Sequence, residues 1–223
     1  MGEPAERLRP EIGLFIAAAE KESLTPVYAE GAAGGRVNRY RIFDIAPVAG
    51  PVPAELAAGW EMVRVVQRGP LVLPQLPGAV SYFGTAQHLS YTGAALRREL
   101  TSRSRGPLLP SPPPSEDTVA VVIPIRKTQA WWDLSQDERQ AHFRSDERHT
   151  AIGLRYADRI FRTLYHSRYL GLPTAYDFIT YFEFSRAQAA DFRRLLAELR
   201  DPNKNPEWTY VDLEHEIWMV KTA

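Results

Sequence analysis

The chain has 223 residues, of which 44% are hydrophobic and 24% charged, and its 27 basic and 27 acidic residues give a formal net charge of zero. This balance is typical of an ordinary globular protein and provides no basic footprint for nucleic acid. The absence of cysteine excludes disulfides, iron–sulfur clusters and covalently attached c-type haem.

The length fits one domain, or two small halves that share a core. No apolar run is long enough for a transmembrane helix, so we expect no membrane partner. The N-terminal residues MGEPAERLRPEIG have no charged region followed by an apolar one, as an export signal would. We therefore expect a cytoplasmic protein.

The first half, residues 1–101, is loosely patterned. Alternating or β-rich segments predict strands at 39–48, 60–66 and 79–83. Helical structure is expected at 53–62, as one or two turns, and at 92–100. The apolar run at 11–19 is too short to distinguish a helix from a strand.

A segment rich in proline and serine, SRSRGPLLPSPPPSED, follows the first half. It has no hydrophobic periodicity, which is typical of a linker. We therefore place the boundary at residues 102–118 and the second half at 119–223.

The second half is patterned more clearly. Residues 119–125 predict a buried strand, 177–184 an alternating aromatic strand, and 207–220 one long strand or a bent pair. Two capping-box patterns, Ser135 with Glu138 and Ser185 with Gln188, predict helix starts. Apolar residues at helical spacing follow the second box: Phe192, Leu195, Leu196 and Leu199. The order of these elements favours an α+β fold of antiparallel strands with helices on one face.

The five histidines are not equivalent. His88, His142 and His215 are interpreted as exposed residues, and His166 as structural. His149 ends the charged run RSDERHT and begins the apolar TAIGL, so the pattern alone leaves it open between a structural histidine and a ligand. No HExxH, P-loop, GxGxxG or GxSxG motif is present.

The second half resembles the chlorite dismutase family of haem b proteins. The matching segments, in order, are VVIPIRKTQAWWDLSQDER, the His149-Thr150 pair, RTLYHSR beginning at Arg162, DFITYFEF and EWTYV beginning at Glu207. The first half matches more loosely, through RYRIFDIAPVAGPVP and YFGTAQHLSYT.

The resemblance implies two ferredoxin-like halves with helices on the outer face of antiparallel sheets, and haem b bound by the second half. It implies His149 as the iron ligand, Glu207 as the acid that hydrogen-bonds this histidine, and Arg162 as the catalytic residue. It also implies further cofactor contacts from Trp131, Trp132, Thr180, Phe182 and Tyr91.

The implied activity is decomposition of chlorite to chloride and dioxygen, through an oxo-iron species and hypochlorite held by Arg162. Two alternatives stay open: a coproheme decarboxylase or peroxidase-like haem protein of the same fold, and a haem-free or haem-storing oligomeric module. The resemblance also implies a homo-oligomer, for which we favour a dimer over a pentamer.

Overall fold

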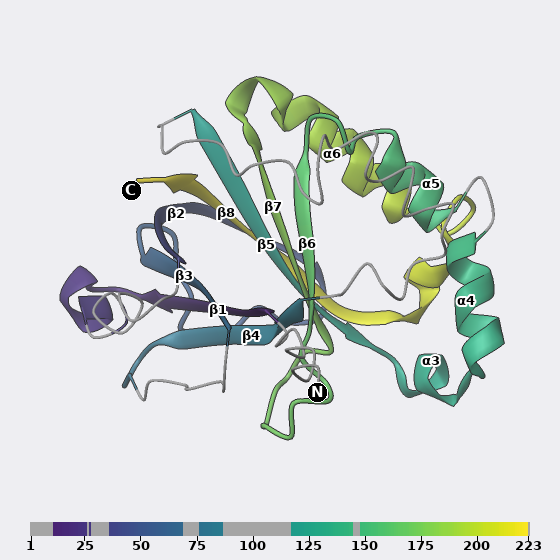
Figure 1. Ribbon diagram of the computed structural model, residues 1–223, viewed down its shortest axis with the longest axis horizontal. Helices are drawn as coiled ribbons and strands as arrows, with labels where there is room; N and C mark the ends of the chain where they lie inside the picture. The colour runs from purple at the N-terminus through teal and green to yellow at the C-terminus, as the bar shows by residue number, and fades with distance from the viewer. Residues whose placement is uncertain are drawn as a thin grey trace, which may run out of the picture.

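Eight antiparallel strands close into a barrel, in the order β1-β3-β2-β8-β5-β7-β6-β4 (Figure 1). The strands are β1 (Glu11–Ala18), β2 (Arg36–Ala49), β3 (Glu61–Arg68), β4 (Val80–Ala86), β5 (Thr118–Lys127), β6 (Phe161–His166), β7 (Phe178–Ser185) and β8 (Val211–Lys221). Successive side chains of a strand point to opposite faces, so each strand supplies one row to the barrel interior and one to its outside. The expected α+β fold with antiparallel strands is confirmed.

This computed structural model describes residues 11–25, 27, 36–68, 76–86, 117–144 and 148–222. The helix expected at 92–100, most of the linker, His88 and Tyr91 lie outside the described residues. Within the described part of the chain, no helix combines the length and apolar character needed to cross a membrane.

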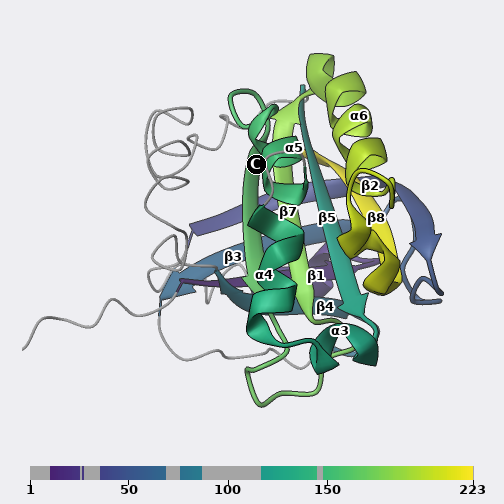
Figure 2. The same ribbon diagram turned by 90° about the vertical axis from the view of Figure 1, so that its right-hand side faces the viewer.

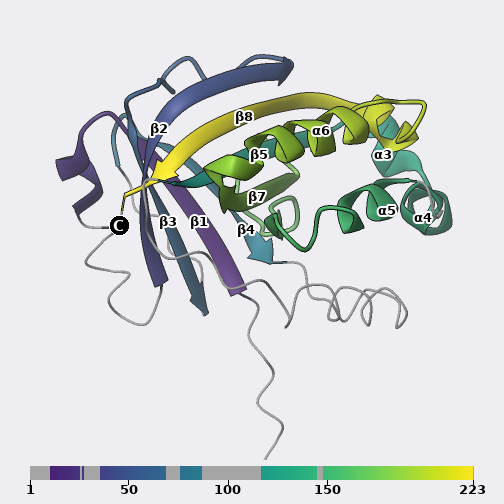
Figure 3. The same ribbon diagram turned by 90° about the horizontal axis from the view of Figure 1, so that it is seen from above.

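The α-helices lie on one side of the barrel, against the strands of the second half (Figures 1 and 2). They are α3 (Gln129–Asp133), α4 (Gln136–Arg144), α5 (His149–Leu154) and α6 (Ala189–Leu199). Short 3-10 helices occur at η1 (Lys21–Leu24), η3 (Arg186–Gln188) and η4 (Pro206–Tyr210). Seen from above, α6 runs along β5 and β8 (Figure 3).

The two halves of the sequence contribute to one ring of strands. Around this ring the first half appears in the order β4-β1-β3-β2, and the second half in the corresponding order β8-β5-β7-β6. The sheet therefore continues across the boundary that the sequence places at 102–118. That each half is ferredoxin-like stays a prediction.

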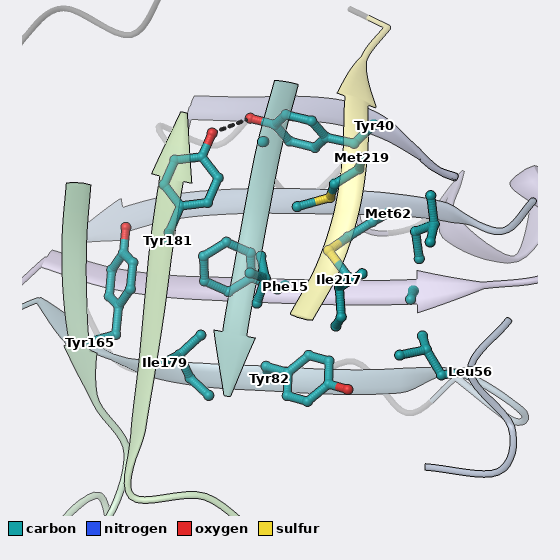
Figure 4. Close-up of a cluster of buried hydrophobic side chains, with 14 of the residues drawn as sticks. Phe15, Tyr40, Leu56, Met62, Tyr82, Tyr165, Ile179, Tyr181, Ile217 and Met219 are labelled. Carbon is teal, nitrogen blue, oxygen red and sulfur yellow. Dashed lines mark hydrogen bonds between the residues drawn. The ribbon is translucent and has the colours of Figure 1, made fainter. Parts of the chain in front are cut away.

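Apolar side chains fill both faces of the second-half strands. The interior cluster includes Phe15, Tyr40, Tyr181 and Ile217 (Figure 4). The outer cluster joins β5, β7 and β8 to α5 and α6. The residues of α6 that enter it are those spaced as an amphipathic helix in the sequence: Phe192, Leu195, Leu196 and, partly buried, Leu199.

Both predicted capping boxes are confirmed. The Ser135 amide donates to Glu138 Oε2 at 2.7 Å, and the Glu138 amide donates to Ser135 Oγ at 3.3 Å. Ser185 and Gln188 form the second box, at the start of η3. These local hydrogen bonds need no tertiary partner, so the sequence alone was sufficient to predict them.

Four expectations are wrong. Residues 53–60 form turns instead of a helix, and β3 starts at Glu61. The segment 207–220 is not all strand, because η4 precedes β8. His215 is fully buried inside the barrel instead of exposed, since Tyr82 and Tyr176 surround it there. His142 is partly buried, because it packs against Trp131 and Tyr210.

Candidate functional site

A cavity lies between the outer face of β5–β8 and the helices that cover it. It encloses about 510 Å³ of space between atoms, including its mouth to solvent. The strands contribute Ile123, Ile125, Lys127, Arg162, Thr180, Phe182, Val211 and Glu214. The helices and the residues that follow them contribute His149, Leu196, Leu199, Arg200, Asn205, Glu207 and Trp208.

His149 stands at the first residue of α5, and its ring is held by Glu207 of η4. Its Nδ1 lies 2.7 Å from Glu207 Oε2, and within the described part of the chain neither atom has another hydrogen-bond partner. The Phe143 ring packs edge-on against the imidazole, with centroids 5.4 Å apart. With Nδ1 committed to Glu207, Nε2 is the ring nitrogen left for a ligand in the cavity.

The other oxygen of Glu207 is bound by Lys127. The Lys127 Nζ donates to Glu207 Oε1 at 2.6 Å, and both side chains are almost wholly buried. Burial would raise the pKa of Glu207, but its charge interactions and hydrogen bonds with His149 and Lys127 outweigh that effect. The pKa of Glu207 therefore lies well below its ordinary value of 4.5, and the carboxylate stays ionised.

Arg162 presents a guanidinium to the same cavity. On β6, residues 161, 163 and 165 face the barrel interior, so Arg162 faces outward. The side chain is accessible because it borders the cavity, yet enough protein surrounds it that desolvation lowers the pKa of the guanidinium, against the charge of Glu207. Arg162 makes no ion pair with any residue that the structure describes.

Thr180 and Phe182 line the cavity beside Arg162, and the strand register explains why. Phe182 of β7 is directly opposite Arg162, and Thr180 is opposite Leu164. All three therefore share the outer face of the sheet. The structure brings together five of the predicted residues: His149, Arg162, Thr180, Phe182 and Glu207.

Trp131 and Trp132, the two tryptophans predicted as cofactor contacts, do not line this cavity. Trp131 is buried against Phe143 and Tyr210, with the Lys127 ammonium 4.8 Å from its ring centroid. It thus lies behind the residues that hold His149. Trp132 stacks on Phe178, at 5.9 Å between centroids, and its Nε1 is buried with no hydrogen-bond partner among the residues that the structure describes. Tyr91 lies outside the described residues.

Two features of the cavity were not predicted from the sequence. Lys127 lies in the segment VVIPIRKTQAWWDLSQDER, but nothing in the sequence distinguished it from an exposed lysine at the end of a strand. Arg200, just after α6, donates to Glu214 Oε1 at 2.9 Å and to Glu216 Oε1 at 2.5 Å. Within the described residues, no group of three or more His, Asp or Glu side chains could hold a metal ion.

The chain is similar in sequence to known proteins. The family model described as chlorite dismutase matches residues 74–211. A chlorite dismutase from Ideonella dechloratans is 36% identical over 86 residues, which are 39% of this chain and 27% of that protein's length.

The fold is also similar to solved structures. A dimeric chlorite dismutase from Nitrobacter winogradskyi is 31% identical, with a TM-score of 0.66 over 93% of this chain and 99% of that one. A mutant chlorite dismutase from Candidatus Nitrospira defluvii in complex with cyanide is 20% identical, with a TM-score of 0.65 over 96% and 92% of the chains. The second likeness concerns the fold alone.

Proposed function

Because the chain belongs to the chlorite dismutase family, we propose that it is a haem b enzyme that converts chlorite to chloride and dioxygen. The observation that carries this proposal is one cavity lined by both a histidine held by a carboxylate and an arginine without an ion-pair partner among the described residues. An imidazole suits iron, and a permanently charged guanidinium suits a small oxyanion.

The residues present fit a haem. Glu207 engages Nδ1 of His149, which leaves Nε2 for the iron. Phe182 and Leu196 offer apolar walls to a porphyrin. Trp132 lies outside the residues that line this cavity, and its buried Nε1, which has no hydrogen-bond partner among the described residues, is proposed as a donor for a propionate. When bound, haem supplies the redox chemistry that breaks the Cl–O bonds.

Glu207 has the role of orienting the iron ligand. By accepting the Nδ1 proton of His149, it fixes the tautomer and makes the ring more electron-donating. Lys127 supports this role, because a buried ammonium 2.6 Å away helps to keep Glu207 ionised.

Arg162 has the role of holding anions. With haem bound, it would hold chlorite on entry and keep released hypochlorite close to the cofactor, which is a proximity effect. Thr180 and Phe182 wall this part of the cavity. Trp131, Trp132 and Tyr91 are proposed as further cofactor contacts, of which Trp131 acts from behind His149.

The proposal includes a homodimer in the cytoplasm. The dimeric state of the Nitrobacter winogradskyi relative supports the dimer. The cytoplasmic location stays a prediction.

The test is oxygen evolution by the purified, haem-loaded protein. Chlorite added in an oxygen-electrode cell should release one O2 per chlorite consumed. His149→Ala should lose the haem Soret band, while Arg194→Ala, on the exposed side of α6, should keep both haem and activity.

Two other results would refute the proposed chlorite activity. Haem binding through His149 without oxygen release would refute the chlorite activity and favour a coproheme decarboxylase or peroxidase-like protein. Failure of the wild-type chain to bind haem would refute the activity and the site together.

A further inference from the structure

A tryptophan of β8 donates a hydrogen bond to a carboxylate under α6. Ile217 and Met219 of this strand belong to the interior cluster, so Glu216 and Trp218 face outward, toward the helix (Figure 3). Trp218 Nε1 donates to Glu216 Oε2 at 2.5 Å, and both residues are buried. The indole proton therefore already lies on a hydrogen bond to a group that is able to accept it.

The carboxylate of Glu216 is connected to the cavity by Arg200. Arg200 Nη1 donates to Glu216 Oε1 at 2.5 Å, and Arg200 itself lines the cavity. A buried carboxylate needs such a counter-charge to stay an anion. Arg200 also donates to Glu214, so it keeps an acidic partner when Glu216 takes up a proton.

Aromatic rings in contact connect Trp218 with the cavity wall. Phe182 lines the cavity, and its ring centroid is 4.9 Å from that of Phe192. The Phe192 ring in turn meets Trp218 edge-on, at 5.3 Å between centroids. Two ring contacts therefore separate the indole from the place where the cofactor would lie.

On its other side, Trp218 is one ring contact from solvent. Trp218 is only 2% exposed, but the ring of Phe43, at 6.4 Å between centroids, is part of a residue that is 46% exposed. The Arg193 guanidinium lies 4.7 Å from the centroid of the Trp218 ring. This positive charge opposes a second one on the indole, so loss of an electron must be accompanied by loss of the Nε1 proton.

The other tryptophans lack this arrangement. The Lys127 ammonium lies over the ring of Trp131, and Nε1 of Trp132 has no hydrogen-bond partner among the described residues. Of the tryptophans in the described part of the chain, Trp218 alone donates to a carboxylate. It is therefore the one whose proton has an acceptor when its ring is oxidised.

We propose that Trp218 is a one-electron redox residue, which passes electrons from aromatic reductants outside the cavity to the haem after a hydroperoxide has oxidised it. The inference rests on the haem binding of the proposed function, but not on its chlorite activity. Trp218 gives up an electron by way of Phe192 and Phe182, and its Nε1 proton moves to Glu216 Oε2.

A phenol or arylamine at Phe43 then returns an electron to the indole radical, and the proton returns from Glu216. Two such reductants each lose one electron and one proton. Together these convert one hydrogen peroxide to two water molecules, so electrons and atoms balance.

The direct test is electron paramagnetic resonance of the full, haem-loaded chain, frozen soon after addition of hydrogen peroxide. A tryptophan radical should appear, with hyperfine couplings that change when the protein contains indole-deuterated tryptophan. Trp218→Phe should lose this signal. Trp60→Phe, beside the interior cluster, is the matched control and should keep it.

A wild-type signal that deuteration leaves unchanged, or a tryptophan signal that survives in Trp218→Phe, refutes the proposal. Glu216→Gln tests the proton transfer and serves if Trp218→Phe does not fold. It keeps an oxygen that accepts a hydrogen bond but removes the base, so the radical should be lost. An undiminished radical in Glu216→Gln overturns the proposal.

A kinetic test uses tyramine coupled to dextran, a phenol on a polymer too large to enter the cavity. Its oxidation by hydrogen peroxide should proceed with wild type and Trp60→Phe and be lost with Trp218→Phe. The Soret band and the release of oxygen from chlorite should be alike in all three. Equal oxidation of the polymer by wild type and Trp218→Phe refutes the route. A Soret band without oxygen release refutes only the chlorite activity, whereas a Soret band without a tryptophan radical refutes only this inference.

Discussion

Glu207 is the residue on which the candidate site depends most. Its two oxygens face two different partners, Nδ1 of His149 at 2.7 Å and Nζ of Lys127 at 2.6 Å. A buried carboxylate is stable as an anion only with such partners. The same contacts orient the imidazole, so the position of His149 and the ionisation of Glu207 are linked.

This linkage predicts a pH-dependent loss of stability. The folded-state pKa of Glu207 is below the ordinary 4.5, so its contribution is present above about pH 4.5 and is lost as the pH falls further. At pH 7, Glu207→Gln should lower the free energy of unfolding by about 3–5 kcal/mol. Urea unfolding at pH 7, 5 and 3 should show the gap between variant and wild type closing on acidification. A gap that is constant with pH would contradict the assigned ionisation.

Arg162 gives a second prediction at this scale. Arg162→Ala should still bind haem, because no described contact joins Arg162 to His149, the proposed iron ligand. It should inactivate in fewer turnovers, since hypochlorite escapes and oxidises the protein. Total oxygen released per enzyme and hypochlorite trapped in solution measure this. An unchanged turnover number with no trapped hypochlorite would exclude the retention role.

At the scale of elements, α6 is both a part of the core and a wall of the site. Phe192 is fully buried between Phe182 and Phe184 of β7 and Trp218 of β8. Four residues later on the same helix, Leu196 lines the cavity. Packing of this helix therefore positions one side of the site.

Truncation of Phe192 should lower both the stability of the protein and its retention of haem. Phe192→Ala should lower the free energy of unfolding by about 3–5 kcal/mol, because it leaves a large void in the core. It should also weaken haem retention, measured by transfer of haem to apomyoglobin. Arg194→Ala, two residues away on the exposed side, is the matched control and should change stability by less than about 0.5 kcal/mol. Equal effects of the two variants would show that α6 is not anchored in this way.

At the scale of the whole molecule, the closed ring of strands unites the two halves. In the second half, β8 pairs with β2 and β6 pairs with β4 of the first half. Removing the first half would expose both edges of the remaining sheet and its apolar inner face.

The fragment 117–223 should therefore not fold alone. We expect it to aggregate or to lack near-ultraviolet circular dichroism, whereas the full chain should unfold in one transition seen alike by fluorescence and circular dichroism. A monomeric fragment with a cooperative transition would contradict this prediction. It would then favour the boundary at 102–118 as one between independent domains.

Local patterns account for the elements that were predicted correctly. The capping boxes at Ser135 and Ser185 involve residues three apart, and the apolar spacing of α6 repeats every turn, so both features can be recognised in a short window of sequence. The expected strand at 207–220 was wrong at its start, because Pro206 and the burial of Glu207 between Lys127 and His149 favour a 3-10 turn there. No local pattern contains those distant partners.

The sequence by itself predicted the family and the antiparallel α+β class, and it singled out His149, Arg162 and Glu207 as candidate site residues, because motifs and periodicity are local properties of the chain. Only the tertiary structure placed Lys127 on Glu207, His215 inside the barrel and Arg64 among buried tyrosines. Each of these depends on strand register and ring closure, which bring together residues separated by 80 positions or more, as Lys127 and Glu207 are. Burial and pairing of charges are decided by those distant contacts, and the composition of a segment does not reveal them.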